Sequence, residues 1–523
     1  MSSFVLLALL FLYVGCSPLM GSSSPVPDNS EGKQTNEDAL SPDPDIFFPD
    51  GFAIVVNQVG YMQGHSLEHI DGPWRAGIRR HFTVNDYKPM AEVGKAVGIR
   101  FMSLFVLAEM DRLNVVATLP HARQEGTDFD NHENIGPEQL EIMGYVKKNA
   151  ANIELGVAGV GHEWWDDGVK TRSEWYNLAD NEPRSEEMVR RHMDVIRNIL
   201  WQYGISEDQG HSFPESFSAY GYYWNPGADY STGRLFSDYG GKYVSTRFGH
   251  IPELNPPPEM SGGFDNGVYA YDRGIYGNVW HRYADPPSEP VETFVADQLD
   301  SHWANWLATD DWLQPEVNEM WIEFFRRVQA YPYRYLAKNT EQFYSQMLYK
   351  KHTTVNLNNG RAEIDNRSMP DDPYQYDLLG NMVLSIPLQD GQHVSQALID
   401  GNAVAAYFEE AGYGYIYLPK LDQDVYTVTW EIGNEPIPNS VNNSGTYNVY
   451  DSRPGSNVSR YEIKMYGTQD VRFRVSDDYT ATSEHEGLTI LNQEYDSSAR
   501  ELVVTIQGQD IIGETGVIRL DRN

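Results

Sequence analysis

The sequence has little cysteine and few basic residues. Cys16 is its single cysteine, so the chain has no internal disulfide framework. Only 39 Lys and Arg stand against 75 Asp and Glu, which gives a formal net charge of -36. Because binding to nucleic acid needs a basic footprint, this imbalance argues against a nucleic-acid partner. It also disfavours long contacts with a strongly sulfated polymer, and we find no internal repeat.

Long apolar runs are scarce too, and the longest is at the N-terminus. Residues 4–14 are apolar, a run too short to span a bilayer but typical of a signal-peptide core. Cys16 follows at the position where bacterial lipoproteins carry a lipidated cysteine. No Lys or Arg precedes Lys33, and Tyr13 stands where Leu is usual, so a plain cleaved signal is the alternative. We expect export to the periplasm or cell surface, with a lipid anchor at Cys16 as the sole route to a membrane.

The rest of the chain is too long for one ordinary hydrophobic core. Its sequence pattern also changes along the chain. After a Ser-, Pro- and Asp-rich tether at residues 17–49, short apolar runs alternate with helical patterns over residues 50–350. This alternation indicates a mostly parallel sheet covered by helices, and a (β/α) barrel is the fold that suits nearly 300 such residues. The expected strands are 52–56, 99–107 and 153–160, and the expected helices are 87–98 and 185–204.

From about Thr353 the pattern is all-β. Short strands are separated by turns rich in Asn, Gly and Asp, and the run EPIPNSVNN at residues 435–443 breaks the series. Two β-sandwich domains are expected, at 351–434 and 435–523.

Ionisable side chains stand where several of the expected α/β strands end. Side chains at the carboxyl ends of parallel strands line the functional site of such folds. The stretch GVAGVGHEWWDDG, residues 156–168, is the clearest case, because an apolar strand runs directly into His, Glu, Trp and Asp. A polar residue at a strand end is often only a turn former. The recurrence of such residues at several strand ends is therefore stronger evidence for a site than any one of them. The stretches concerned are HFTVNDY (81–87), FVLAEMD (105–111), GVGHEWWDD (159–167) and DSHWANW (300–306).

Two of these stretches carry a family resemblance. Thr83-Val84-Asn85-Asp86 is similar to the Thr-Phe-Asp-Asp motif of the polysaccharide deacetylase family, and His162-Glu163-Trp164-Trp165-Asp166 is similar to its His-Ser/Thr-x-x-His motif. Residues 81–348, about half of the chain, resemble a divergent member of that family in layout and partial motifs. The resemblance implies a distorted (β/α) barrel and hydrolytic removal of acetyl groups from a poly- or oligosaccharide.

The same resemblance implies a metal site. Asp86, His162 and Asp166 would hold a divalent ion, Zn first and Mn, Fe or Co as alternatives, which activates a water molecule. Asn85 stands where the family has its base aspartate, and Asp166 stands where it has a second histidine. Glu163 is the expected substitute base, although it could instead cap the following loop, and His302 is the expected acid.

Aromatic and arginine side chains are the candidates for substrate binding. The chain has 12 Trp and 34 Tyr, and sugar faces stack on such rings. We expect stacking by Trp164, Trp165, Tyr223 and Trp224, with Tyr222 beside them; sealing of the barrel rim is the alternative. Arg247 and Arg273 suit a uronate carboxylate, and structural ion pairing is their alternative.

Two other functions remain open. Some members of the family associated with marine algal polysaccharides are implied to act as dehydratases or lyases on uronate-containing, ulvan-type oligosaccharides. Elimination does not need the aspartate that Asn85 replaces, so the substitution favours a dehydratase or lyase. A glycan-binding lipoprotein without catalytic activity is the third possibility.

Overall fold

We describe a computed structural model of the chain. It describes residues 46–60, 72–131, 135–171, 173–177, 179–224, 230–250, 255–257, 260–274, 282–358 and 360–523. These residues all belong to one compact unit, Pro44–Asn523. The expected signal segment and most of the expected tether lie outside the described residues. The last residues of that tether are packed, since Ile46 is fully buried and Phe47 pairs with Ser385.

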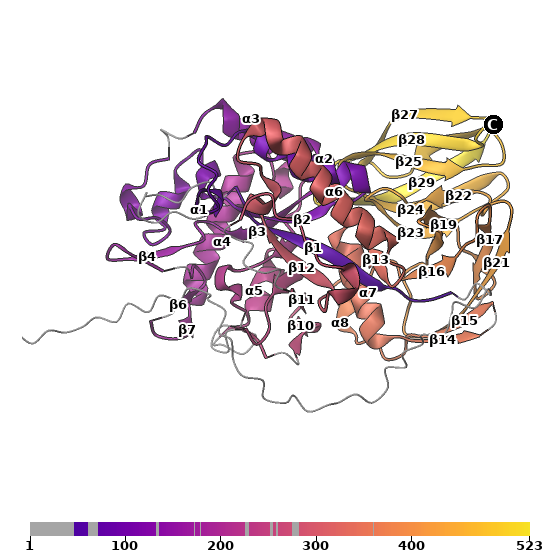
Figure 1. Cartoon of the computed structure of the whole chain (residues 1–523), viewed down its shortest axis with the longest axis horizontal. Coiled ribbons are helices and arrows are strands. Elements are labelled where there is room, and N and C mark those ends of the chain that lie inside the picture. Colours follow the sequence, from indigo (N-terminus) through magenta and orange to yellow (C-terminus); the bar gives the residue numbers. More distant parts are fainter. Residues whose placement is uncertain are drawn as a thin grey trace, which may run out of the picture. The chain divides into compact units, whose positions relative to one another are not determined.

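The first part of the unit is α/β, and Figure 1 shows it in indigo to pink beside an all-β part in orange to yellow. Its strands are β1 (Asp50–Val59), β2 (Phe101–Val106), β3 (Ile153–Gly159), β4 (Trp164–Asp166), β5 (Val169–Thr171), β6 (Tyr176–Asn177), β7 (Glu182–Pro183), β8 (Ser216–Phe217), β9 (Tyr243–Thr246), β10 (Gly263–Asp265), β11 (Val268–Asp272), β12 (Gln298–His302) and β13 (Arg334–Leu336). Its helices are α1 (Gly72–Arg75), α2 (Lys88–Val97), α3 (Pro137–Lys148), α4 (Glu186–Trp201), α5 (Thr232–Asp238), α6 (Gln314–Ala330) and α7 (Thr340–His352).

The main sheet has the strand order β10-β11-β9-β8-β3-β2-β1-β12, with β13 added to the start of β1. Apart from the antiparallel β10, its strand pairs are parallel. The sequence predicted β1, β2 and β3 correctly, because buried parallel strands are continuous apolar runs. It also predicted α2 and α4; α4 begins where Ser185 caps Met188 N at 3.3 Å.

The two faces of this sheet differ in chemistry. On one face, residues such as Ile54, Val56, Phe105, Leu155 and Val157 pack in the core beneath the covering helices. Because side chains alternate along a strand, the other face carries the next residues in each strand. Near the carboxyl ends these are polar: Asn57, Ser218, Ser245, Arg273, Asp300 and His302.

The sheet curls until its two ends approach each other. On a flat sheet β11 and β1 would lie about 24 Å apart, at about 4.8 Å for each strand step. Yet Arg273, just after β11, reaches Asn57 of β1 at 2.9 Å, and Gly274 forms a parallel bridge with Leu299 of β12. Within the described residues β11 and β12 do not otherwise pair. The structure is therefore mixed α/β, and the residues that it describes do not form a closed barrel.

The second part is made of packed sheets with a short helix, α8 (Asp372–Gln375). Its strands are β14 (Thr354–Asn358), β15 (Arg361–Asp365), β16 (Val383–Pro387), β17 (His393–Ile399), β18 (Asn402–Ala403), β19 (Ala406–Glu410), β20 (Tyr413–Tyr417), β21 (Val425–Gly433), β22 (Ser440–Asn442), β23 (Asn448–Arg453), β24 (Val458–Met465), β25 (Thr468–Arg474), β26 (Tyr479–Ser483), β27 (Leu488–Asp496), β28 (Glu501–Gly508) and β29 (Glu514–Arg522). The sheet orders are β14-β15-β21-β17-β18, β16-β20-β19-β22-β25-β28-β27 and β23-β24-β29-β26.

One of these sheets crosses the expected domain boundary at residue 435. Strand β19, before the boundary, pairs in parallel with β22, after it, through Ala406–Val441 and Tyr407–Asn442. The second part also binds the first, because Thr446 Oγ1 donates to Ala151 O at 2.5 Å and Lys464 pairs with Glu341 at 2.9 Å. The two expected sandwiches therefore share a sheet.

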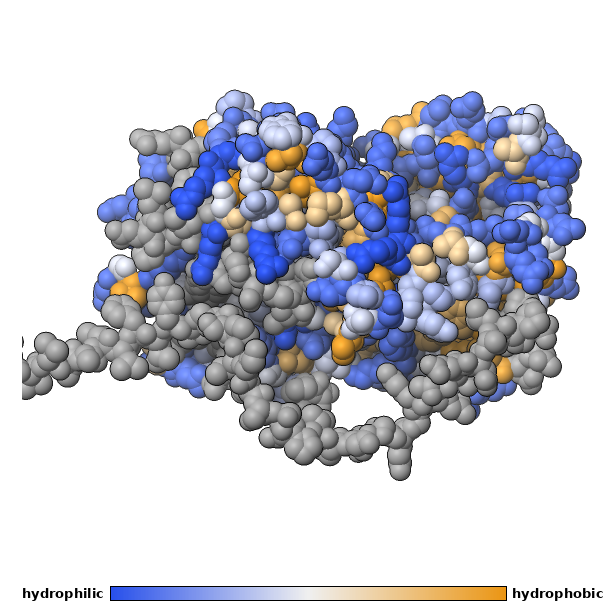
Figure 2. All heavy atoms as spheres, viewed as in Figure 1, coloured by the Kyte–Doolittle hydropathy of each residue, from blue (hydrophilic) through white to orange (hydrophobic). Residues whose placement is uncertain are grey.

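The surface fits the acidic composition. Figure 2 shows a face that is mostly hydrophilic, with hydrophobic residues in small separate groups. Within the described ranges, no helix combines the length and the apolar character that a membrane span requires.

Candidate functional site

A buried hydrogen-bond network lies at the carboxyl end of the main sheet. Asp300 of β12 accepts hydrogen bonds from Asn57 Nδ2 at 2.6 Å and from the Tyr222 hydroxyl at 2.8 Å. Arg273 donates to Asn57 Oδ1 and to Ser218 Oγ, both at 2.9 Å. These five residues form what we call the carboxyl-end network: Asn57 and Asp300 lie in the later parts of β1 and β12, and Ser218, Tyr222 and Arg273 follow β8 and β11.

Charge is balanced inside this network. The Arg273 guanidinium lies 3.6 Å from Asp300 and over the Tyr222 ring, 4.4 Å from its centroid. Arg273 is 1% exposed and Asp300 is 3% exposed, so the pair is withdrawn from water. Burial, and after it the Asp300 carboxylate, raises the pKa of Tyr222 well above its usual value. Tyr222 therefore stays protonated at physiological pH.

Strained backbone surrounds the network. Gln58, His162 and Tyr222 have positive φ angles of 58°, 60° and 62°, a conformation that is uncommon for residues other than glycine. The Gln58 side-chain amide nitrogen lies 3.0 Å from His162 Nε2. This contact orients the His162 ring toward the end of β1. Strain of this kind gathers at functional sites.

A cavity of about 610 Å³ opens where β11 and β12 face each other. Its lining includes Arg247, Asp272, Arg273, Gly274 and Leu299. The volume is in the range of small-molecule sites. In the described part of the chain, Arg247 Nε and Nη1 are buried without a hydrogen-bond partner, and the nearest carboxylate, Asp272, is 4.0 Å from Nε. Arg247 therefore retains donors for an anionic ligand.

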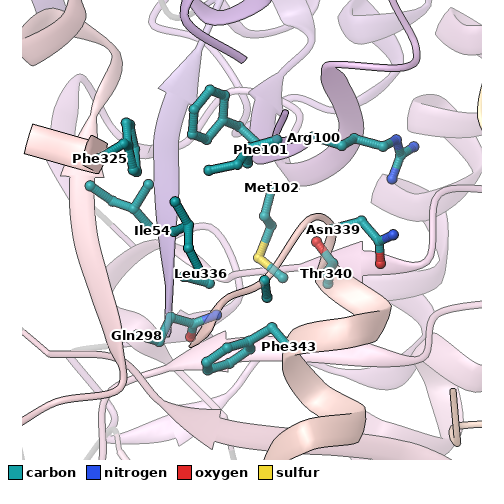
Figure 3. A pocket seen from close by; sticks show the side chains of 13 residues that line it. Ile54, Arg100, Phe101, Met102, Gln298, Phe325, Leu336, Asn339, Thr340 and Phe343 are labelled. Carbon is teal, nitrogen blue, oxygen red and sulfur yellow. The ribbon is translucent and has the colours of Figure 1, made fainter. Parts of the chain in front are cut away.

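A second cavity lies at the amino ends of β1 and β2 and is far too small for a ligand. Its volume is about 20 Å³, enough for about one water molecule. Figure 3 shows Ile54, Phe101 and Phe325 around it, with Asn339 and Thr340 on the opposite side. This cavity belongs to the core and not to the site.

The three expected metal ligands are not brought together. Asp86 is in a 3-10 helix, Val84–Asp86, where it accepts from Thr83 N at 2.7 Å and pairs with Arg80 at 2.5 Å. Asp166 is 58% exposed at its side chain and binds Trp164 Nε1 at 2.8 Å. His162 contacts Gln58 instead. No group of three or more His, Cys, Asp or Glu among the described residues is arranged to hold a metal. These residues do not fit the expected ion, and we derive no step through it.

The motif at residues 83–86 was also assigned to the wrong element. We expected it at the end of a strand, but it forms a capped 3-10 helix, Val84–Asp86, just before α2, and the strand that ends upstream of it is β1. Asn85 is exposed and accepts from Lys88 Nζ at 2.6 Å. It has no contact with the carboxyl-end network in the described structure.

The other two expected catalytic residues differ in placement. Glu163 is fully buried between Lys170 at 2.6 Å and Arg123 at 3.6 Å, so it is engaged in a structural ion-pair network. His302 ends β12, opposite Asn57 in the strand register, and is 7% exposed. His302 thus lies beside the carboxyl-end network, and its role as an acid stays a prediction.

The expected stacking residues are buried. Trp164, Trp165, Tyr223 and Trp224 are each at most 4% exposed. The Trp164 ring stacks on the His121 ring, with 4.3 Å between the centroids. The Arg184 guanidinium also packs on Trp164, 3.6 Å from the ring centroid. These rings are packed in the interior, so no open face of theirs is available to a sugar. Two exposed aromatic side chains lie near the end of β12 instead, Tyr283 (47% exposed) and Trp312 (75%).

The structure brings Arg247, Arg273, Tyr222, His162 and His302 to the carboxyl end of the sheet. Asn57, Ser218 and Asp300 were missed as site residues. The signal was present for two of them, because Asn57 directly follows the apolar run FAIVV and Asp300 is two residues before His302, on the same face of its strand.

In comparisons with known proteins, no family model matches the chain, and neither a curated protein nor a solved structure does so. The site is therefore judged on its own geometry.

Proposed function

We propose that the chain is an exported carbohydrate-active enzyme that works at the carboxyl-end network. The reaction proposed is elimination from a uronate-containing oligosaccharide, with no step assigned to the expected metal ion. We also propose that the main sheet is a distorted barrel of the polysaccharide deacetylase type, followed by β-sandwich domains. The support for this fold is the contact of Arg273 with Asn57 across the two ends of the sheet.

The observation that carries the proposal is the network Arg273–Asn57–Asp300–Tyr222 beside a cavity that Arg247 also lines. A uronate carboxylate is a planar anion that an arginine fork binds well. Arg247 has buried donors available for it, and the positive charge of Arg247 and Arg273 would stabilise the negative charge that develops when the neighbouring carbon loses its proton.

The elimination needs a base and an acid. The base takes the proton from the carbon next to the carboxylate, and that electron pair forms a double bond to the adjacent carbon. The carbon–oxygen bond at the adjacent carbon breaks, and the departing oxygen receives a proton. His162, whose Nε2 lies 3.0 Å from the Gln58 amide nitrogen, is the proposed base, and Tyr222, kept protonated by burial, is the proposed acid.

The test uses the purified protein with uronate-containing oligosaccharides and with acetylated oligosaccharides. We expect ultraviolet absorbance from the unsaturated uronate and no acetate. Tyr222→Phe is expected to lower turnover about 100-fold, because proton transfer by a positioned group contributes on that scale. Arg247→Ala should raise KM. The matched control is Arg326→Ala, an exposed arginine of α6 that pairs with Glu319, which should change neither.

Two other outcomes would replace the proposal. Acetate release without new absorbance would point to hydrolytic deacetylation with a divalent metal. Glycan binding without either product, retained in Tyr222→Phe, would point to a binding protein.

A further inference from the structure

The loop between β3 and β4 is wrapped around a buried carboxylate. Glu174 is fully buried at its side chain; its Oε1 accepts from Val160 N and its Oε2 accepts from His162 N, both at 2.9 Å. His192 Nδ1 of α4 lies 2.7 Å from Oε1. One side chain thus binds the backbone on both sides of Gly161 and joins it to a covering helix.

The sequence of this loop suits the arrangement closely. Gly159 has a φ of +151°, and a Cβ there would lie 2.3 Å from Glu174 Oε2. A Cβ on Gly161 would lie 2.4 Å from Ala122 O. Neither position leaves room for a side chain, which explains the glycines of the motif GVGH. His162, the next residue, has the positive φ of 60°.

The buried charge is held in one orientation. A carboxylate that leaves water needs hydrogen-bond donors, and Glu174 receives two backbone N–H groups and the His192 ring. His192 is 1% exposed and lies between the Trp164 and Trp175 rings, at 6.2 and 5.5 Å. Tight packing around His192 therefore limits how Glu174 can turn.

We propose that Glu174, oriented by His192, is a positioning residue that directs His162 toward Gln58 and the carboxyl-end network. Strained backbone persists only where its surroundings hold it, and the Glu174 carboxylate is what binds the amide of the strained residue. The catalytic meaning of this arrangement rests on the proposed function of His162. The placement of His162 is a separate claim, and it can be measured without turnover.

The experiment observes the His162 ring by NMR in the purified protein with 15N-labelled histidine, assigned with His162→Gln. In Glu174→Gln the carboxylate is replaced by an amide, which cannot accept both backbone bonds and the His192 bond in the same way. We expect the ring signals of His162 to shift or broaden. If a substrate has been found, kcat should fall about 10- to 100-fold, the usual scale for loss of such a supporting contact.

The matched control is Glu154→Gln, which also alters a buried carboxylate of the α/β part. Glu154, near the start of β3, binds Arg100 at 2.9 Å and Ser216, and its described contacts include neither Glu174 nor the β3–β4 loop. Its loss should lower thermal stability and leave the His162 signals and kcat in place. A shift of equal size in both variants would mean that general destabilisation is responsible, and would overturn the proposal.

A milder pair covers the case in which Glu174→Gln fails to fold. His192→Leu removes the donor to Glu174, whereas His192→Gln supplies an amide donor. We expect displaced His162 signals in the first and signals close to the wild type in the second. Unchanged signals in folded His192→Leu would overturn the proposal. Displaced signals in a protein that turns over no oligosaccharide would uphold the positioning by Glu174 and reject the proposed function alone.

Discussion

At the residue scale, Asp86 and Asp166 are the same residue type in different surroundings. Burial raises the pKa of Asp86, and the Arg80 guanidinium offsets this only in part. Asp86 also caps Thr83 N, a contact that an amide oxygen can keep. Asp166 is largely in water. The two carboxylates therefore contribute to stability unequally, which a shared metal would not predict.

We expect Asp86→Ala to lower the free energy of unfolding by about 1–3 kcal/mol, since it removes the cap and leaves Arg80 without its buried partner. Asp86→Asn keeps the cap, so its cost should stay below about 1 kcal/mol. Asp166→Asn, at an exposed site, should fall within about 0.5 kcal/mol of the wild type. Urea denaturation measures all three. Equal and large losses for Asp86→Asn and Asp166→Asn, appearing only with added divalent metal, would restore the expected ligand set.

At the element scale, local sequence pattern determined the type of each element, whereas long-range contacts determined which elements pair. The runs that became β1, β2 and β3 are apolar and bounded by turns, and α4 has a serine cap, so their types were readable from short windows. The contact between β11 and β12 could not be predicted from the sequence. Gly274 and Leu299 are separated by a segment without a strand pattern, and the bridge exists only because the whole sheet curls.

The seam between β11 and β12 depends on a glycine. A Cβ on Gly274 would lie 2.4 Å from Ala296 Cβ and 3.2 Å from Gln298 O. We expect Gly274→Ala to lower the free energy of unfolding by about 1–3 kcal/mol through overpacking. It should also weaken substrate binding, because Arg273 is the preceding residue.

The control for that prediction is Gly144→Ala in α3, where a Cβ would meet nothing within 4 Å. It should stabilise the protein by about 0.5–1 kcal/mol, because alanine favours the helix and restricts the unfolded chain. Chemical denaturation distinguishes the two. A Gly274→Ala protein as stable as Gly144→Ala would show that the seam is not tightly packed.

At the scale of the whole molecule, buried charge joins the α/β part to the all-β part. Glu215, 19% exposed at its side chain, lies 3.0 Å from Lys242 and 3.5 Å from Lys464 of β24, which also pairs with Glu341. Burial alone would raise the pKa of Glu215, but Lys464 and Lys242 lower it to about 2. Because the folded pKa is depressed, the stabilisation is complete above the unfolded value near 4.5 and is lost as the pH falls through about 2.

We therefore expect Glu215→Gln to cost about 3 kcal/mol at pH 6 and about half of that at pH 3. Urea denaturation over this pH range measures the difference. Glu435→Gln, which alters a carboxylate that is 76% exposed and paired with Arg474, should show no such trend. A cost of Glu215→Gln that does not change with pH would mean that the carboxylate is not held by the two lysines.

The sequence by itself determined what depends on near neighbours. The apolar runs became strands, the capped amphipathic stretches became helices, and the turn-rich part after Thr353 became packed sheets. It also placed His302 at the end of a strand, which is β12. Only the tertiary structure decided which residues meet there. Asn57 and Asp300 are separated by 243 positions, and their contact exists because β1 and β12 pair as neighbouring parallel strands. In the folded chain Asp86 takes part in a helix cap and Glu163 pairs with two cations. A buried carboxylate binds the nearest donors in space, whatever motif it belongs to in the sequence.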